Sequence, residues 1–336
     1  MSSRARSLLR YSISGLLTVV FLFIAFRDTD FKKLYATLFA ADYWWMLATL
    51  GCVMVSHAFR AWRWRYLLDP IKPNISFRNL FSGVMIGYFV NNVLPRAGEL
   101  VRPYTIGKLE SIPKSAALGT IVVERIMDAA SFLSLIVIIP LIYDGPLLQA
   151  FPWLNQAGTI ISVVTFGFLL LVIVLMVRRD WTDAVVSSLF SRKLASRFEN
   201  VIHSFLDGFL FIKRPASALP ILLLSIVVWS LYIVMTYFAF FSFGLQHQLG
   251  FGAAIVVLAI SSIGIAIPTP GATGGYHWFA AQTLIRLFHV PNEVALSYAT
   301  ATHAVGFIGV TIVGLYFFLH DHITIKDAMS KPMEQA

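Results

Sequence analysis

Arginine and glutamate side chains follow a proline-glycine break in the first third of the chain. The break is Leu-Pro-Arg-Ala-Gly at residues 94–98, and Glu99 and Arg102 come directly after it. Guanidinium groups bind phosphate through paired hydrogen bonds, so Arg96 and Arg102 are candidate ligands of an anion. Glu99 stands three residues from each arginine and is placed to hold either one. Two asparagines precede the break, and they are candidates to bond either a ligand or a neighbouring helix: Asn91 and Asn92.

A second break of the same kind occurs at residues 267–271, Ile-Pro-Thr-Pro-Gly. Gly271, Gly274 and Gly275 make this segment rich in glycine, and such backbone can close around a phosphate as a nest of amides. A helix that restarts after a break presents its positive N-terminal end, which favours an anion. We expect such restarts near Gly98 and Tyr276. His277 opens the second restarted helix, where contact with a ligand and packing as a polar core residue are equal alternatives.

A third set of ionisable residues, Glu124-Arg125-x-x-Asp128, lies within an apolar stretch. Glu124 and Asp128 share a helix face, and Arg125 reaches Asp128 at a separation of three residues. Unpaired charges near the centre of a membrane cost about 2.5–3.5 kcal/mol each, so they face a polar cavity or one another. The functional interpretation is a lipid head-group or proton site, and the alternative is a structural ion pair.

The composition requires these groups to be positioned by membrane-spanning helices. The chain has 336 residues, of which 58% are hydrophobic and 13% charged, and its mean hydropathy is +0.75. This excludes a soluble domain and predicts one all-α polytopic membrane domain over residues 1–336. Six apolar segments are long enough to cross a bilayer: 8–26, 44–59, 116–143, 159–177, 219–243 and 294–319.

The distribution of basic residues predicts the topology. Lys and Arg collect in cytoplasmic loops, including residues 60–78 and 96–114. Residues 77–94 lie between these two basic loops, which predicts a re-entrant hairpin entering from the cytoplasm. A second hairpin, 251–267 with 276–288, then enters from outside, and both termini are cytoplasmic. Trp44 and Trp45 should mark one membrane interface and Trp62 and Trp64 the other, while residues 178–214 read as an amphipathic helix on the cytoplasmic face.

The two breaks divide the chain into similar halves. Residues 43–143 and 217–319 each contain a span, a broken hairpin and a second span, and the charge pattern gives the halves opposite orientations. Inverted repeats of this kind bind substrate near the membrane midplane, between the halves. The alternative is a pair of unrelated proline kinks.

The motifs together resemble a known family. Arg63-Trp64, the segment 87–102, Glu124-Arg125-x-x-Asp128 and Pro268-x-Pro270-Gly271-x-x-Gly274 are similar to the flippase-like membrane family. That family includes the transmembrane region of lysylphosphatidylglycerol synthase, the multiple peptide resistance factor. The resemblance implies a bacterial or archaeal protein of the cell membrane that moves a lipid between leaflets. The chain departs from the pattern at Ala272 and His277, and its short tail predicts no aminoacyl-transferase domain.

The leading functional prediction is a transporter that flips an anionic lipid, either a phospholipid or a polyprenyl-phosphate type. Arg96, Arg102 and the glycine amides would meet the phosphate, while the three carboxylates balance charge or carry protons. The alternatives are an integral-membrane enzyme acting on a lipid phosphate or lipid-linked sugar, and a noncatalytic membrane partner of a soluble lipid-modifying enzyme. No catalytic, nucleotide-binding or metal-binding motif is present in the sequence, so we predict no enzyme activity, cofactor, metal or nucleic-acid partner.

Overall fold

The described part of the chain is built from helices and contains no β-strand. The computed structural model describes residues 3–152 apart from 144 and 146, the single positions 156, 163, 167 and 170, and residues 215–330. The helices in chain order are α1 (Ser3–Phe26), α2 (Phe31–Phe39), α3 (Tyr43–Leu68), α4 (Phe77–Val93), α5 (Gly98–Glu110), α6 (Lys114–Ile142), α7 (Leu147–Ala150), α11 (Pro215–Ser242), η2 (Leu245–His247), α12 (Phe251–Ala266), η3 (Pro270–Ala272), α13 (Gly275–Phe288), α14 (Asn292–His320) and α15 (Ile325–Ser330).

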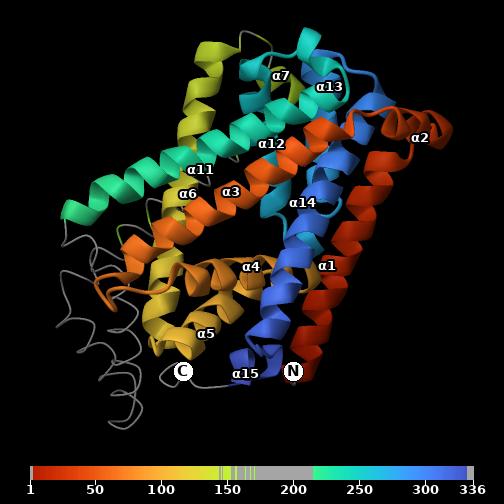
Figure 1. Cartoon of the computed structure of the whole chain (residues 1–336). Coiled ribbons are helices and arrows are strands. Elements are labelled where there is room, and N and C mark those ends of the chain that lie inside the picture. Colours follow the sequence, from red (N-terminus) through yellow and green to blue (C-terminus); the bar gives the residue numbers. More distant parts are fainter. Residues whose placement is uncertain are drawn as a thin grey trace.

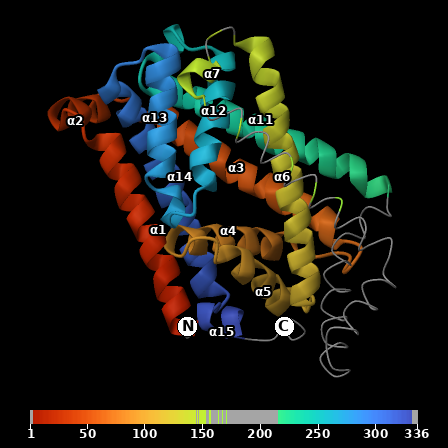
Figure 2. The same cartoon turned by 180° about the vertical axis from the view of Figure 1, so that it is seen from behind.

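Five long helices and two hairpins define the arrangement of the described residues. Helices α1, α6 and α14 run along the height of the molecule, while α3 and α11 pack side by side and cross it obliquely (Figure 1). The α4–α5 hairpin lies in the lower half, and the α12–α13 hairpin lies in the upper half, as the reverse view also shows (Figure 2). The start of α1 and the last helix, α15, lie at the same end (Figure 1).

Several described helices are suited to cross a membrane. By length and composition these are α6, α11 and α14, with a fourth span if α1 and α2, which meet at a 90° bend, count together. The second predicted span, 44–59, corresponds to α3, which extends nine residues beyond the predicted end at Phe59 and takes in several arginines. The predicted span 159–177 and the predicted amphipathic helix 178–214 lie outside the described residues, apart from positions 163, 167 and 170. The count of six spans therefore stays a prediction.

Each proline break ends a helix where the sequence predicts it. A residue before proline is pushed out of the helical region, and both Leu94 and Ile267 have extended backbone there. Helix α5 then begins at Gly98 and α13 at Gly275. The predicted helix restarts after the breaks are confirmed.

The arms of each hairpin cross at a pair of glycines. A Cβ atom on Gly98 would lie 1.9 Å from the carbonyl oxygen of Gly87, and one on Gly275 would lie 2.5 Å from that of Gly264. Only glycine permits such close approach of two backbones. The two pairs have the same separation along the chain, so both hairpins close in the same way.

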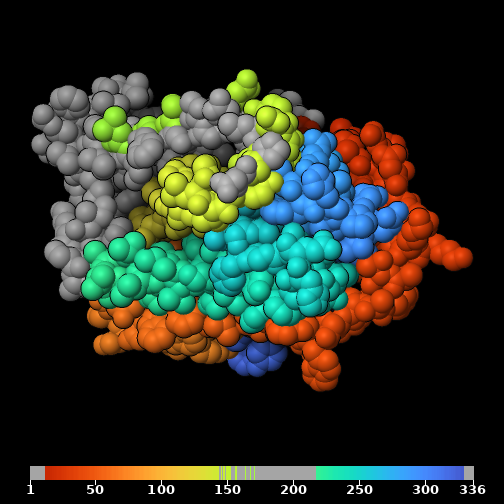
Figure 3. Space-filling model, turned by 90° about the horizontal axis from the view of Figure 1, so that it is seen from above, coloured from red at the N-terminus to blue at the C-terminus, as the bar shows by residue number. Residues whose placement is uncertain are grey.

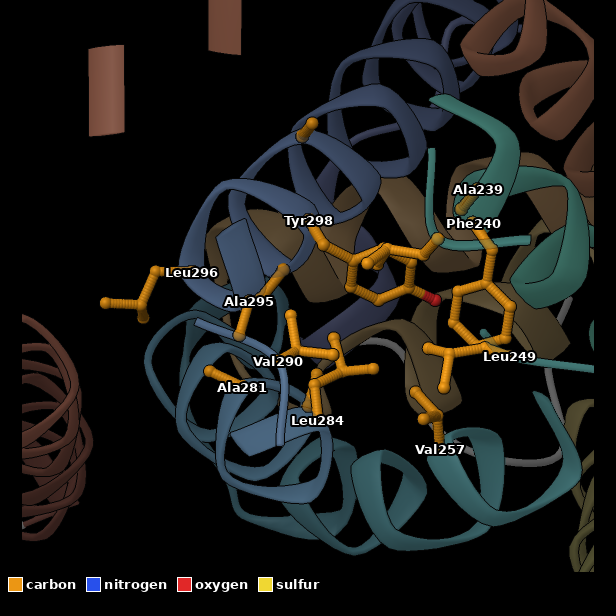
Figure 4. Close-up of a cluster of buried hydrophobic side chains, with 14 of the residues drawn as sticks. Ala239, Phe240, Leu249, Val257, Ala281, Leu284, Val290, Ala295, Leu296 and Tyr298 are labelled. Carbon is orange, nitrogen blue, oxygen red and sulfur yellow. The ribbon is translucent and has the colours of Figure 1, made fainter. Parts of the chain in front are cut away.

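The upper half has its own apolar core. Side chains from α11, α12, α13 and α14 converge there, and the Tyr298 ring lies 5.5 Å from the Phe240 ring (Figure 4). The Tyr298 hydroxyl donates to the carbonyl oxygen of Thr236 at 3.3 Å, which satisfies its buried polar end. Seen from above, α12 and α13 form the upper face beside α7 and the beginning of α14 (Figure 3). This packing fixes the second hairpin against the long helices.

Asp321, which directly follows α14, connects the end of that helix to the first hairpin. Its carboxylate accepts hydrogen bonds from Arg78 and Ser82 of α4, and Lys108 of α5 donates to its backbone carbonyl at 3.1 Å. Burial raises the pKa of the Asp321 carboxyl, but the hydrogen bonds from Ser82, Arg78 and His320 outweigh it and hold this pKa below its usual value. The α4–α5 hairpin is thereby tied to the end of α14.

We expect Asp321→Asn to lower the free energy of unfolding by about 1.5–3 kcal/mol at pH 7, the range for hydrogen bonds to a charged group. Because the folded-state pKa is lowered, this contribution is complete above the unfolded-state pKa of about 3.9 and decreases as the pH falls from there through the folded-state pKa. Thermal unfolding of detergent-solubilised protein at pH 7 and at about pH 3 measures the difference. An equal gap between wild type and variant at both pH values would contradict this prediction.

Candidate functional site

Two carboxylates on α6 form the centre of a buried ion-pair cluster. Arg60 of α3 reaches both, with its Nη1 atom 2.6 Å from Glu124 Oε1 and 2.7 Å from Asp128 Oδ2. Its Nη2 atom donates to the hydroxyl of Tyr232 on α11 at 2.9 Å. Because one guanidinium contacts both carboxylates, the predicted shared helix face is confirmed.

Two further arginines complete the buried cluster. Arg63 Nη2 lies 2.9 Å from Asp128 Oδ1, and its Nη1 donates to the Ser225 hydroxyl at 2.9 Å. Arg102 of α5 places Nη2 2.8 Å from Glu124 Oε2, and its guanidinium lies 3.9 Å above the Trp64 ring. Cation–π contact of this kind stabilises a desolvated guanidinium. Three helices therefore deliver arginine or carboxylate groups to one buried point.

Helix α3 supplies its part of the cluster from one face. Arg60, Arg63 and Trp64 stand at helical spacing, and the Trp64 indole donates to the Thr120 hydroxyl at 2.8 Å, which fixes the ring. The prediction that Arg60 and Arg63 belong to a cytoplasmic basic loop is wrong, since they are 3% and 0% exposed. The placement of Trp64 in an interfacial belt is also wrong, because its side chain is fully buried. The carboxylates of α6 draw this segment into the interior.

Arg125 extends the cluster outward. Its Nη1 atom is 3.6 Å from Asp128 Oδ2, as the spacing of three residues predicts, and its Nε atom is 3.9 Å from Glu99 Oε1. The prediction that Glu99 holds Arg96 or Arg102 is wrong, because Glu99 is paired with Arg125. Helix α5 turns Glu99 toward α6 and leaves Arg102 to Glu124.

A narrow crevice opens beside this cluster, between the first hairpin and α6. It is partly open to the outside and has room for about one water molecule. Four charged or amide side chains line it: Asn91, Glu99, Arg102 and Arg125. Arg102 is 3% exposed, and its Nη2 atom forms the ion pair with Glu124, whereas its Nε atom has no hydrogen-bond partner. A buried guanidinium with a free Nε donor at a crevice is suited to receive an anion.

The remaining predicted residues gather at the second break. Arg96 Nη2 donates to the Ala266 carbonyl oxygen at 2.7 Å, so the tips of the two hairpins meet. His303 lies 2.8 Å from the carbonyl oxygen of Gly271, and the Gly274 amide donates to His277 Nδ1 at 3.3 Å. Gly275 contacts Gly264 as described above. These groups form a second polar region, and none of them lines the crevice.

The two asparagines have structural partners. Asn91 Oδ1 accepts from the Gly98 amide at 2.8 Å, across the first break. Asn92 Nδ2 donates to the Thr311 hydroxyl at 2.9 Å, which joins α4 to α14. Asn92 therefore bonds a neighbouring helix, whereas Asn91 also lines the crevice.

Sequence reasoning missed four contributors to the cluster: Arg60, Arg63, Tyr232 and Ser225. The sequence did contain a signal for the two arginines. They share one helix face with Trp64 directly after an apolar run, and charges in such a position favour a partner inside the membrane. The two α11 residues carry no such signal. Among the described residues, no three His, Cys, Asp or Glu side chains are grouped so that they could hold a metal ion.

These features define an integral membrane protein, all-helical in its described part, with a buried cluster of arginines and carboxylates between its spans. Residues 8–314 match the model of the lysylphosphatidylglycerol synthase transmembrane region, and the chain belongs to this family. No solved structure is significantly similar to it.

The chain is also similar to archaeal proteins named UPF0104 membrane protein. One from Methanocaldococcus jannaschii is 40% identical over 91 residues, 26% of this chain and 27% of that protein's length. One from Methanothermobacter thermautotrophicus is 27% identical and covers 63% of this chain and 66% of its own length. One from Pyrococcus horikoshii is 27% identical, with 70% and 74% covered.

Proposed function

We propose that this protein transfers an anionic, phosphate-bearing lipid between the leaflets of the cell membrane, with both termini in the cytoplasm. The observation that carries the proposal is the buried Arg102 guanidinium, which lines the crevice beside Arg125 and whose Nε atom lacks a hydrogen-bond partner. When the crevice widens, a phosphate would bind to this donor and to Arg125, while its acyl or prenyl tails stay in the bilayer. The family of the transmembrane region of a phospholipid synthase supports a lipid as the ligand.

The meeting of the two hairpins supports a route through the membrane. Arg96 on the first tip caps the last carbonyl of α12 on the second, where the negative end of a helix favours a cation. We propose that the halves 43–143 and 217–319 are inverted repeats and that this contact is the closed junction between them. Rocking of one half against the other would open the crevice to the opposite leaflet.

Arg125→Gln should reduce transfer about 10–100-fold, because a charge-assisted hydrogen bond contributes about 1.5–3 kcal/mol. Its loss leaves Glu124 and Asp128 paired with Arg60 and Arg63, so folding should persist. The assay is bleaching of a fluorescent phosphatidylglycerol in proteoliposomes by a membrane-impermeant reductant. Arg286→Gln, an exposed arginine on α13, is the matched control and should transfer like wild type. Undiminished transfer by Arg125→Gln, or a chemically altered lipid after incubation, would refute the proposal.

A further inference from the structure

The ion-pair cluster and the crevice together contain an uneven set of charges. Four guanidinium groups face three carboxylates within the described residues: Arg60, Arg63, Arg102 and Arg125 against Glu99, Glu124 and Asp128. Each arginine lies within 4 Å of a carboxylate, but the group as a whole carries one excess positive charge. Excess charge away from water is costly, so a ligand that supplies one negative charge would be favoured.

The most weakly paired arginine of the cluster lies at the crevice. Arg60 and Arg63 donate directly to the two carboxylates of α6. Arg125, in contrast, is 3.6 Å and 3.9 Å from its nearest carboxylate oxygens and 41% exposed. Arg102 is paired with Glu124 but keeps one free donor, its Nε atom, as described above. The two arginines that line the crevice are thus the ones left to bind an anion.

Glu99 is the carboxylate among the residues that line the crevice. We propose that Glu99 selects lipids by the charge of their head group, an inference that rests on the proposed function. The crevice then accepts a phosphodiester with one negative charge and rejects a phosphomonoester with two. One negative charge neutralises the cluster. A second would stand beside the Glu99 carboxylate without a partner, because the guanidinium groups are already balanced.

Phosphodiesters occur both in glycerophospholipids and in polyprenyl-phosphate glycosides, and the test separates these sources. Proteoliposomes would carry fluorescent phosphatidylglycerol, fluorescent phosphatidic acid or a fluorescent polyprenyl phosphoglycoside, at pH 8. A monoester there carries close to two charges, since its second pKa is about 6 in phosphorylated side chains. Wild type should transfer at least one of the two diesters about 10-fold faster than phosphatidic acid. The diester that is transferred faster shows whether the head group belongs to a glycerophospholipid or to a polyprenyl-phosphate glycoside.

The decisive variant is Glu99→Gln, which removes one negative charge without changing the shape of the side chain. It should lower the preference for diester over monoester about 10-fold, whereas Glu99→Asp should keep the wild-type preference. Glu293→Gln, an acid in the first turn of α14 that is outside the cluster, should also keep it. Two results would overturn the proposed role of Glu99 and leave the proposed function intact. One is a Glu99→Gln variant that transfers lipid with the wild-type preference, and the other is a wild type that transfers diester and monoester equally. Wild type that transfers no probe overturns the proposed function as well.

Discussion

Glu124→Gln is expected to lower the free energy of unfolding by about 3–5 kcal/mol, the range for breaking a buried ion pair from one side. The Glu124 side chain is fully buried, and its oxygens lie 2.6 Å from Arg60 and 2.8 Å from Arg102. The amide of glutamine has the same shape but only one acceptor and no charge. Arg60 and Arg63 would then keep Asp128 as their buried carboxylate, whereas Arg102 would lose the carboxylate with which it is paired.

Unfolding of detergent-solubilised protein, followed by tryptophan fluorescence, measures this loss. A double-mutant cycle with Arg102→Met tests its cause, because Glu124→Gln should cost less where one arginine is already absent. Glu293→Gln is the control and should remain within about 0.5 kcal/mol of wild type. A loss below about 1 kcal/mol for Glu124→Gln would mean that water screens the cluster as it screens a surface pair.

The sequence predicted those features that depend on neighbours along the chain. Pro95 and Pro268 force the preceding residue into extended backbone, so the helix ends and the restarts at Gly98 and Gly275 follow from local sterics. The contact between Arg125 and Asp128 follows from helical spacing. Local geometry of this kind needs no knowledge of the remaining fold.

The sequence could not predict the partners that meet across helices. Arg60 was assigned to a loop because the rule for basic residues treats each one as solvated, whereas its carboxylates lie on α6, 64 and 68 positions away. Glu99 has Arg96 and Arg102 three residues before and after it in its own segment, yet it pairs with Arg125 of α6. Charge pairing in the interior is decided by packing, which a single sequence does not contain.

The glycine crossings provide a test of the hairpins that is independent of charge. Gly87 and Gly98 close the first hairpin, and Gly264 and Gly275 close the second. In the second pair, a Cβ on either glycine would lie 2.5 Å from the carbonyl oxygen of the other. Because these contacts involve backbone atoms, no side-chain rotation can relieve them, and the arms would have to separate.

We therefore expect Gly98→Ala to destabilise the protein by more than about 3 kcal/mol, at or above the upper limit for an overpacked core. The new methyl group would lie 1.9 Å from the Gly87 oxygen and 2.8 Å from Asn91 Oδ1. Separation of α4 from α5 would also withdraw Arg102 from Glu124, so lipid transfer should be lost with stability. Gly51→Ala is the matched control, because that site on α3 has no atom within 4 Å of a new Cβ, and it should remain within about 1 kcal/mol of wild type. If Gly98→Ala unfolds like Gly51→Ala, the arms of the first hairpin do not cross at these glycines.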